Sequence, residues 1–516
     1  MVNSMRNLII KLFLFSFIFS QTNSIDIATT GANKLRMHGQ LNVFHNPATM
    51  GYYAKQSHID TLNSNVSLKD LSEQSEESQV QSNDNNENEF SEFENFQDDL
   101  SDSLSLKIDE VIASSDSIIA DTLDVKSHFS MNLLSVSFGL GSGSITPDWI
   151  TNQLFGGKDL RDIEQRKSFL EGISKDINVQ LPLFSSLPLL NFSFGSNVVS
   201  LGQVVSYTSI NLPKDLAQVP FIGLEKGKEL NINSLEIQHV TYLPISYSKG
   251  FVIKPGIIPF GQKSYAGFRS NLLIGLAEVH TESVRGKVQG TDTNTLIDAD
   301  IELGVSLPVS IDDSFPKGSL PIGIGIDLGM ITEIDDKLTI GASIDNIFAS
   351  FNWSGATVYS ASVQGELTPD EIADADSLSE LLDQSELKES SSYKTNLPIS
   401  INLSGTYKAK DWAVLDGNIR LDLGDYYWAS KKPLISLGSE FFPNNNVPLY
   451  FGISFGGENS FAWGTGVSFK MGSVILDLSG GQLGGTFNNA TGMQFGFGLR
   501  IPVSYTHLTL PTILLV

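Results

Sequence analysis

The chain has 516 residues, enough for one large domain, and its 58 acidic residues outnumber 33 basic ones to give a net charge of −25. This charge argues against nucleic acid as a partner, because phosphate contacts need clustered Lys and Arg. The sequence contains no cysteine, which excludes disulfides, thiol nucleophiles and cysteine-ligated metal centres.

Residues 1–24 have the pattern of a secretory signal peptide. Arg6 and Lys11 precede an apolar run over residues 12–19, and small polar residues follow it. We predict cleavage after Ser20 or Ser24, because the run is shorter than the roughly 18 apolar residues that a membrane anchor needs. No later segment is long and apolar enough to be a membrane helix, so the exported chain is expected to be soluble or a β-barrel.

Two segments precede the predicted strands. Residues 25–61 contain Asn46–Pro47–Ala48, and Pro47 forces Asn46 out of the helical region, so a turn is expected there. In residues 62–126, acids outnumber lysines by 18 to 2 between Asp60 and Asp124. Such a segment cannot bury enough apolar surface to fold, so we predict a disordered insertion. A calcium-binding or partner-binding tail is the alternative, although the spacing of a calcium loop is missing.

From residue 127 to 503 the pattern changes to strands with one apolar and one small or polar face. It is clearest in 447–503, where Phe451, Phe455, Phe495 and Phe497 alternate with Gly, Ser and isolated charges. Period two indicates strands, and a glycine-rich second face is typical of the lumen side of a membrane barrel. We therefore predict an all-β fold: an antiparallel transmembrane β-barrel of about 14 strands.

The expected strands are 128–140, 189–195, 198–210, 236–249, 265–289, 296–310, 322–331, 337–352, 397–408, 414–423, 434–442 and four between 449 and 501. The strand over 265–289 exceeds the roughly 10 residues that cross a bilayer, so it should extend above the membrane. Helical insertions are expected at 148–174, 214–222 and 368–387. Of these, 368–387 begins with Thr368 as a cap and acids in its first turn.

Charged residues on the small-residue face should point into the lumen. Most of them are expected to pair across strands, and some could line a path, since each would cost about 2–4 kcal/mol at the bilayer midplane. Aromatic residues at strand ends are expected at the membrane interfaces, namely Trp353, Trp412, Tyr426, Tyr427 and Trp428. The predicted lumen charges are Glu302, Asp327, Arg420, Asp422, Lys470, Asp477 and Arg500.

Three motifs resemble the FadL and PorV-like superfamily of outer-membrane barrels. They are Asn46–Pro47–Ala48 ahead of the strands, the glycine alternation of residues 322–329, and residues 338–341 leading to Asn346 and Trp353. The resemblance implies that residues 25–61 form an N-terminal hatch inside the lumen. It further implies passive uptake of hydrophobic small molecules or, as the alternative, a scaffold or shuttle for secreted proteins. Outer-membrane lipid would be the surrounding partner.

No active site is expected. Gly452–Gly456 matches the G-x-S-x-G pattern, but it lies inside a period-two strand without the helix that a nucleophile elbow requires. The seven histidines are scattered, so no metal site and no cofactor are predicted. Residues 504–516 resemble translated sequencing-adapter read-through, and we exclude them from the predicted fold.

Overall fold

The computed structural model describes residues 23–36, 45–52, 129–149, 151–152, 163–171, 173, 176–186, 191–292, 294–306, 320–354, 357–368, 386–389, 392–424 and 426–503. Residues 1–22 of the predicted signal peptide (1–24), the acidic insertion of 62–126 and the tail of 504–516 lie outside these residues, whereas Asn23 and Ser24 are described and buried. Residues 369–385 of the helix expected at 368–387 also lie outside them. Its last two residues belong instead to strand β14 (Glu386–Glu389).

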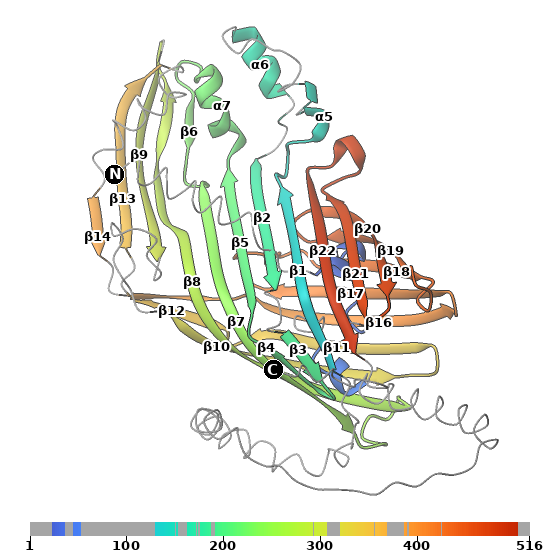
Figure 1. Cartoon of the computed structure of the whole chain (residues 1–516). Coiled ribbons are helices and arrows are strands. Elements are labelled where there is room, and N and C mark those ends of the chain that lie inside the picture. The colour runs from blue at the N-terminus through green and yellow to red at the C-terminus, as the bar shows by residue number, and fades with distance from the viewer. Residues whose placement is uncertain are drawn as a thin grey trace, which may run out of the picture.

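Fourteen strands form a closed antiparallel barrel, as the alternation predicted (Figure 1). Strands β1 and β22 close it, with Phe129 opposite Val503 and Gly141 opposite Gly492. Two positions of the ring are each divided between two short strands. Around the ring lie β1 (Phe129–Gly141), β2 (Ile177–Ser186) with β3 (Asn191–Phe194), β5 (Gln203–Leu212) with β4 (Asn197–Ser200), β7 (Glu236–Ile253), β8 (Lys263–Gly290), β10 (Ile322–Glu333), β11 (Leu338–Ile347), β16 (Ile399–Lys410), β17 (Ala413–Leu423), β18 (Leu434–Phe441), β19 (Leu449–Gly456), β20 (Ser460–Met471), β21 (Val474–Leu483) and β22 (Gly492–Val503).

Membership of the ring differs from the prediction at two whole strands and at the end of a third, because residues 350–352 of the strand expected at 337–352 belong to β12 (Ser350–Ser354), outside the ring. The strand expected at 296–310 is β9 (Thr295–Ser306), which pairs with the far half of β8 and with β13 (Thr357–Leu367), outside the ring. In contrast, β2 belongs to the ring but was not expected. Pro182 lies in the middle of β2 and has no N–H for the ladder, so its sequence does not have the pattern of a central strand.

The long strand predicted over 265–289 is β8, which spans 28 residues. Its first half pairs with β10 inside the ring, and its second half carries β9, β13, β14 and the short β6 (Glu229–Asn231) beyond the rim. This extra sheet leaves the barrel at the same end as helix α7 (Lys214–Ile222) (Figure 1). Helix α7 has the bounds that were predicted. The helical insertion expected at 148–174 contains only α5 (Pro147–Trp149) and α6 (Ile163–Glu171) among the described residues.

The other end of the barrel has short turns, for example at 195–196, 411–412 and 472–473. Barrels of bacterial outer membranes have short periplasmic turns and longer extracellular loops. We therefore assign the short-turn end to the periplasm and the end with α5, α6, α7 and the extra sheet to the outside.

The two faces of the wall differ in chemistry. Apolar side chains point outward and are exposed, such as Ile322 at 60%, Ile324 at 55% and Phe451 at 45%. Polar side chains point inward and are buried, among them Ser468 and Asp477. This is the inverse of a soluble barrel and matches the surface that a lipid bilayer requires. Within the described ranges no helix is long and apolar enough to cross a membrane.

Candidate functional site

The first described segment lies inside the barrel and forms the first part of a plug, which we define as residues 23–36 and 45–52. It begins with helix α2 (Ser24–Ala28), all of whose residues are buried, capped by the Asn23 side chain, which accepts from Asp26 N at 3.0 Å. Ser24 Oγ donates to Ser479 Oγ at 2.9 Å and to Gly496 O at 3.3 Å. The helix is therefore fixed to β21 and β22 through short polar contacts.

A buried ionic cluster joins the two pieces of the plug. His45 Nε2 lies 3.0 Å from Asp26 Oδ2, and Lys34 Nζ lies 3.1 Å from His45 Nδ1 and 3.7 Å from Asp26 Oδ1. Burial lowers the pKa of His45, against the opposing effect of Asp26, so the imidazole is neutral at neutral pH. Burial alone would raise the pKa of Asp26, but His45 and Lys34 lower it overall. Asp26 with Lys34 is the ion pair of this cluster.

Arg36 fixes the plug to a second part of the wall. Its guanidinium bonds to Asp416 of β17 and to Glu440 of β18, and both carboxylates are buried. One cation thus serves two carboxylates that would otherwise be unpaired inside the barrel. Removing it would leave uncompensated charge in a region of low dielectric constant.

The second piece of the plug contains the predicted hatch motif Asn46–Pro47–Ala48. Asn46 Nδ2 donates to Met330 O at 3.0 Å and to Ala342 O at 2.9 Å, on β10 and β11. Asn46 Oδ1 accepts from Ala48 N at 3.0 Å, which forms the turn that Pro47 favours. The asparagine side chain therefore connects the turn to two barrel strands.

Glycines on the inner wall make room for the plug. A Cβ on Gly496 would lie 2.7 Å from Ser24 Cα, one on Gly438 would lie 2.9 Å from Ala32 Cβ, and one on Gly464 would overlap the plug backbone. Gly267 and Gly329 leave the same room for residues 46–47. The small-residue face of the strands therefore contacts the plug directly as well as lining the lumen.

A second element, which we call the roof, packs against the inner wall on the extracellular side of the lumen. It consists of strands β12 (Ser350–Ser354) and β15 (Ser392–Asn396), which form a two-stranded sheet inside the barrel mouth, and of residues 426–430. Phe351 and Trp353 are wholly buried, and Trp353 Nε1 donates to Thr395 Oγ1 at 2.8 Å. A Cβ on Gly275 of β8 would lie 2.6 Å from Trp353 Cη2, so a glycine in the wall leaves room for the roof as well.

A buried carboxylate ties the roof to the wall. Glu278 of β8 is 0% exposed and accepts hydrogen bonds from the hydroxyls of Tyr393 and Tyr427, both in the roof. His280 Nδ1 lies 3.0 Å from Glu278 Oε1. Burial lowers the pKa of His280, but Glu278 and Glu282 raise it above the ordinary value overall, because they stabilise the imidazolium.

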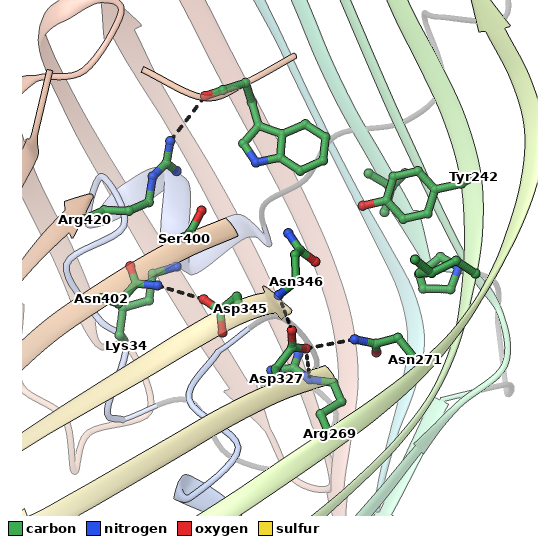
Figure 2. A pocket seen from close by; sticks show the side chains of 14 residues that line it. Lys34, Tyr242, Arg269, Asn271, Asp327, Asp345, Asn346, Ser400, Asn402 and Arg420 are labelled. Atoms are coloured by element: carbon green, nitrogen blue, oxygen red, sulfur yellow. Dashed lines mark hydrogen bonds and ion pairs between the residues drawn. The ribbon is translucent and has the colours of Figure 1, made fainter. Parts of the chain in front are cut away.

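Between plug and roof lies a cavity of about 140 Å³ (Figure 2). Its plug side is polar and includes Lys34, Arg269 and Asp327, whereas Tyr242 and Trp428 supply aromatic surface. The full lining is Lys34, Val205, Tyr242, Pro244, Arg269, Asn271, Leu273, Asp327, Asp345, Asn346, Ser400, Asn402, Arg420 and Trp428.

Five of the predicted lumen charges lie on β17, β20, β21 and β22. Arg500 Nε lies 2.8 Å from Asp477 Oδ2, and Arg420 Nη2 lies 2.9 Å from Asp422 Oδ2. Lys470 Nζ donates to the carbonyl of Pro443 at 2.6 Å. Four of the five therefore form ion pairs within or between neighbouring strands, and Arg420 also lines the cavity.

The other two predicted charges have different positions. Asp327 lies at the cavity, where Arg269 Nε approaches its Oδ2 to 3.1 Å. Arg269, which the sequence did not single out, also donates to the carbonyl of His45 and so connects wall and plug. Glu302 lies on β9, outside the ring, and accepts from Ser283 Oγ at 2.9 Å.

The roof is what the sequence reasoning missed. The prediction of an interfacial belt is wrong for Trp353 and Tyr427, which are buried in the roof cluster and not at the membrane surface. Only Trp412, 53% exposed on a periplasmic turn, has the exposure expected of a belt residue. The glycine at 275 opposite Trp353 was the available signal, because a small residue in a long strand marks close approach of another segment.

Within the described ranges no three His, Asp or Glu side chains come together as metal ligands. The arrangement can instead enclose a small molecule between two closures. A closed barrel with an apolar exterior satisfies every backbone group within a bilayer. The fold therefore defines an outer-membrane β-barrel whose lumen holds a plug, a cavity and a roof.

The chain belongs to a family of unknown function (DUF5723), whose model matches residues 120–477. A comparison with curated protein sequences finds no match. Among solved structures, the chain is similar to the Ralstonia pickettii toluene transporter TbuX at 9% identity and a TM-score of 0.36, covering 73% of this chain and 90% of that one.

Two further structures are similar at the same level. A Pseudomonas aeruginosa FadL homologue has 8% identity and a TM-score of 0.39, with 94% of this chain and 99% of that one covered. The Pseudomonas putida toluene transporter TodX has 11% identity and a TM-score of 0.31, with 73% and 88% covered. Similarity of this degree does not identify a ligand or a mechanism for this chain.

Proposed function

We propose that the barrel is a gated channel for passive uptake of small, mainly hydrophobic molecules across the outer membrane. The observation that carries this proposal is the partly open cavity between the plug and the roof, lined by Lys34 of the plug and Trp428 of the roof, which a static structural barrel would not need. A molecule would enter past the roof, occupy the cavity and leave when a closure or the wall opens.

The wall beside the cavity supports a lateral route into the bilayer. Strand β4 ends at Ser200 and β5 begins at Gln203, so β7 residues 243–245 have no ladder partner on that side. Pro244, inside this interruption, and Val205, just beyond it, line the cavity. An interrupted ladder is the place where a strand pair separates at least cost, because few hydrogen bonds must break.

Two engineered disulfides test the proposal on a chain without cysteines. Ala32→Cys with Gly438→Cys would lock the plug, where the Cβ atoms would lie 2.9 Å apart. Gly325→Cys with Ala349→Cys would lock the base of the roof at 3.1 Å. Both separations are shorter than the roughly 3.5–4.5 Å between the Cβ atoms of a disulfide, so plug and roof must each move away from the wall by a few tenths of an ångström to admit the bridge.

The measurement is uptake of radiolabelled toluene into vesicles containing the purified protein. We expect the oxidised roof lock to slow uptake and a reductant to restore it, with the single cysteine variants as controls. Unchanged uptake with both locks fully oxidised, or no uptake above protein-free vesicles, would contradict a gated channel. Heat-modifiable gel migration establishes that each variant is folded.

The scaffold or shuttle for secreted proteins rested on helical insertions at 148–174 and 368–387. The described part of the first contains two short helices, and most of the second lies outside the described residues. No observation favours that function, and we do not propose it.

A further inference from the structure

The charges at the cavity balance except at one residue. Each cation of the lining has its own carboxylate: Arg269 lies 3.1 Å from Asp327, Arg420 lies 2.9 Å from Asp422, and Lys34 lies 3.7 Å from Asp26. Asp345 is the remaining acidic side chain of the lining. Three cations therefore face four carboxyl groups, and Asp345 is the one without a cation of its own.

Asp345 has weak support from the protein itself. Its Oδ2 accepts from Asn402 Nδ2 at 2.7 Å, and Ser343 Oγ lies at 3.5 Å (Figure 2). Its Oδ1 is enclosed and has no hydrogen-bond partner in the part of the chain that the structure describes. No cation of that part lies within 4.0 Å of the carboxylate. An enclosed carboxylate without a cation is unfavourable unless something else supplies a proton or a positive charge.

The opposite side of the cavity suits the body of an organic molecule. Tyr242 is 5% exposed, its hydroxyl points into the cavity in Figure 2, and that hydroxyl has no hydrogen-bond partner among the described residues. Trp428, Val205 and Leu273 add aromatic and aliphatic surface. Aromatic faces attract organic cations and pack against apolar rings, whereas an inorganic cation would gain little from them.

We propose that the cavity binds a small organic amine in its protonated form, with the ammonium group at Asp345 and the apolar body against Tyr242 and Trp428. This inference rests on the proposed function, and it adds protonated amines to the small molecules that the cavity takes. The volume sets the size, because a cavity of about 150 Å³ holds one benzene ring. One ring with a short aminomethyl group is therefore near the upper limit.

Three probes of similar size and different charge test the inference: benzylamine, benzyl alcohol and benzoate, each titrated calorimetrically into the full-length protein in detergent at neutral pH. We expect benzylamine to bind most tightly. Asp345→Asn should weaken benzylamine about tenfold or more, the scale of a lost hydrogen bond to a charged group, and should leave benzyl alcohol unchanged. Asp411→Asn, on an exposed periplasmic turn, is the matched control.

Several results would overturn the inference. Equal binding of benzyl alcohol would show that the charge is not recognised, and tighter binding of benzoate would show that Lys34 or Arg420 selects an anion. Retention of benzylamine affinity by a folded Asp345→Asn variant would place the ammonium elsewhere. Failure of all three probes to bind would also exclude the amine, whereas toluene uptake in the disulfide experiment tests the channel independently.

Discussion

The plug and the roof close the same lumen by different physical means. The plug contacts a wall of glycines and is held by ions and short polar hydrogen bonds, with Arg36 and the Asp26–His45–Lys34 cluster at its centre. The roof is held by aromatic packing around Trp353 and by one buried carboxylate, Glu278. Docking of the plug should therefore be sensitive to changes of charge and to added Cβ atoms, whereas the stability of the roof should be sensitive to loss of aromatic volume.

The largest effect is expected from Trp353→Ala in the roof. The side chain is wholly buried and its indole N–H bonds to Thr395, so truncation should cost about 3–5 kcal/mol, in the upper part of that range. Trp412→Ala, at a 53% exposed position, should cost under about 1 kcal/mol. Limited proteolysis within 348–398, the segment that carries both roof strands, measures release of the roof, and equal protection in both variants would mean that Trp353 does not hold it.

Arg36→Gln should destabilise the molecule somewhat less than Trp353→Ala, and the effect should be confined to the plug. It leaves Asp416 and Glu440 buried without a cation, at a cost of about 3 kcal/mol. Lys226→Gln breaks an exposed pair with Asp292 and should cost less than about 1 kcal/mol. Single-channel conductance reports plug release, and adding Asp416→Asn with Glu440→Gln should restore the closed state. A closed Arg36→Gln channel would contradict the anchoring role.

Gly464→Ala tests the steric fit between plug and wall without changing any charge, because a Cβ at this position overlaps the plug backbone. Overpacking costs about 1–3 kcal/mol, which corresponds to about 5- to 150-fold in the ratio of docked to released plug. Gly405→Ala, where the nearest atom lies 3.9 Å away, should be silent. Conductance again gives the readout, and identical behaviour of the two variants would argue against steric seating.

The smallest effect, which differs in sign between the plug and the wall strand β8, is the pH dependence of their stability. The pKa of His45 is lowered when the plug is docked, so released plug binds a proton that docked plug does not, and docking weakens as pH falls below about 6.5. The pKa of His280 is raised by Glu278 and Glu282 of its own strand β8, so its contribution is to the folded wall; that contribution is complete below about 6.5 and is lost as pH rises through the raised value.

Separate measurements check these two pH dependences. Conductance should rise in acid and lose that rise in His45→Gln, while the thermal midpoint of barrel unfolding should fall in alkali and lose that fall in His280→Gln. A pH dependence of the same sign for plug and wall would show that the two histidines are not the titrating groups.

The fold was predictable because the wall obeys one local rule. Alternation in 447–503 follows from lipid on one side and a plug on the other, and both constraints act residue by residue along each strand. Membership of β9 and β2 was not predictable. Strand β9 of the extra sheet has the same alternation as a wall strand. Strand β2 contains Pro182, which is unusual in a central strand, so its sequence does not identify it as part of the wall.

The site was harder to predict because its parts come from distant positions. Asn46–Pro47–Ala48 marked the plug, but nothing in the local sequence links Arg36 to Asp416 or Tyr393 to Glu278. The aromatics of the roof lie at strand ends, where interfacial rings also occur, so sequence position alone could not separate the two environments. Charge balance at Asp345 emerges only when all partners are in place.

The plug also bears on how the molecule is assembled. Ser24 contacts Gly496 across 472 residues of sequence, and α2 lies on β21 and β22, the last strands to be synthesised. The first segment of the chain can reach its final position only when those strands are present, and after the ring closes the space around it is enclosed. Insertion of the plug and joining of β1 to β22 are therefore expected to be one late, cooperative step in biogenesis, with the N-terminal segment serving as an internal template for closure.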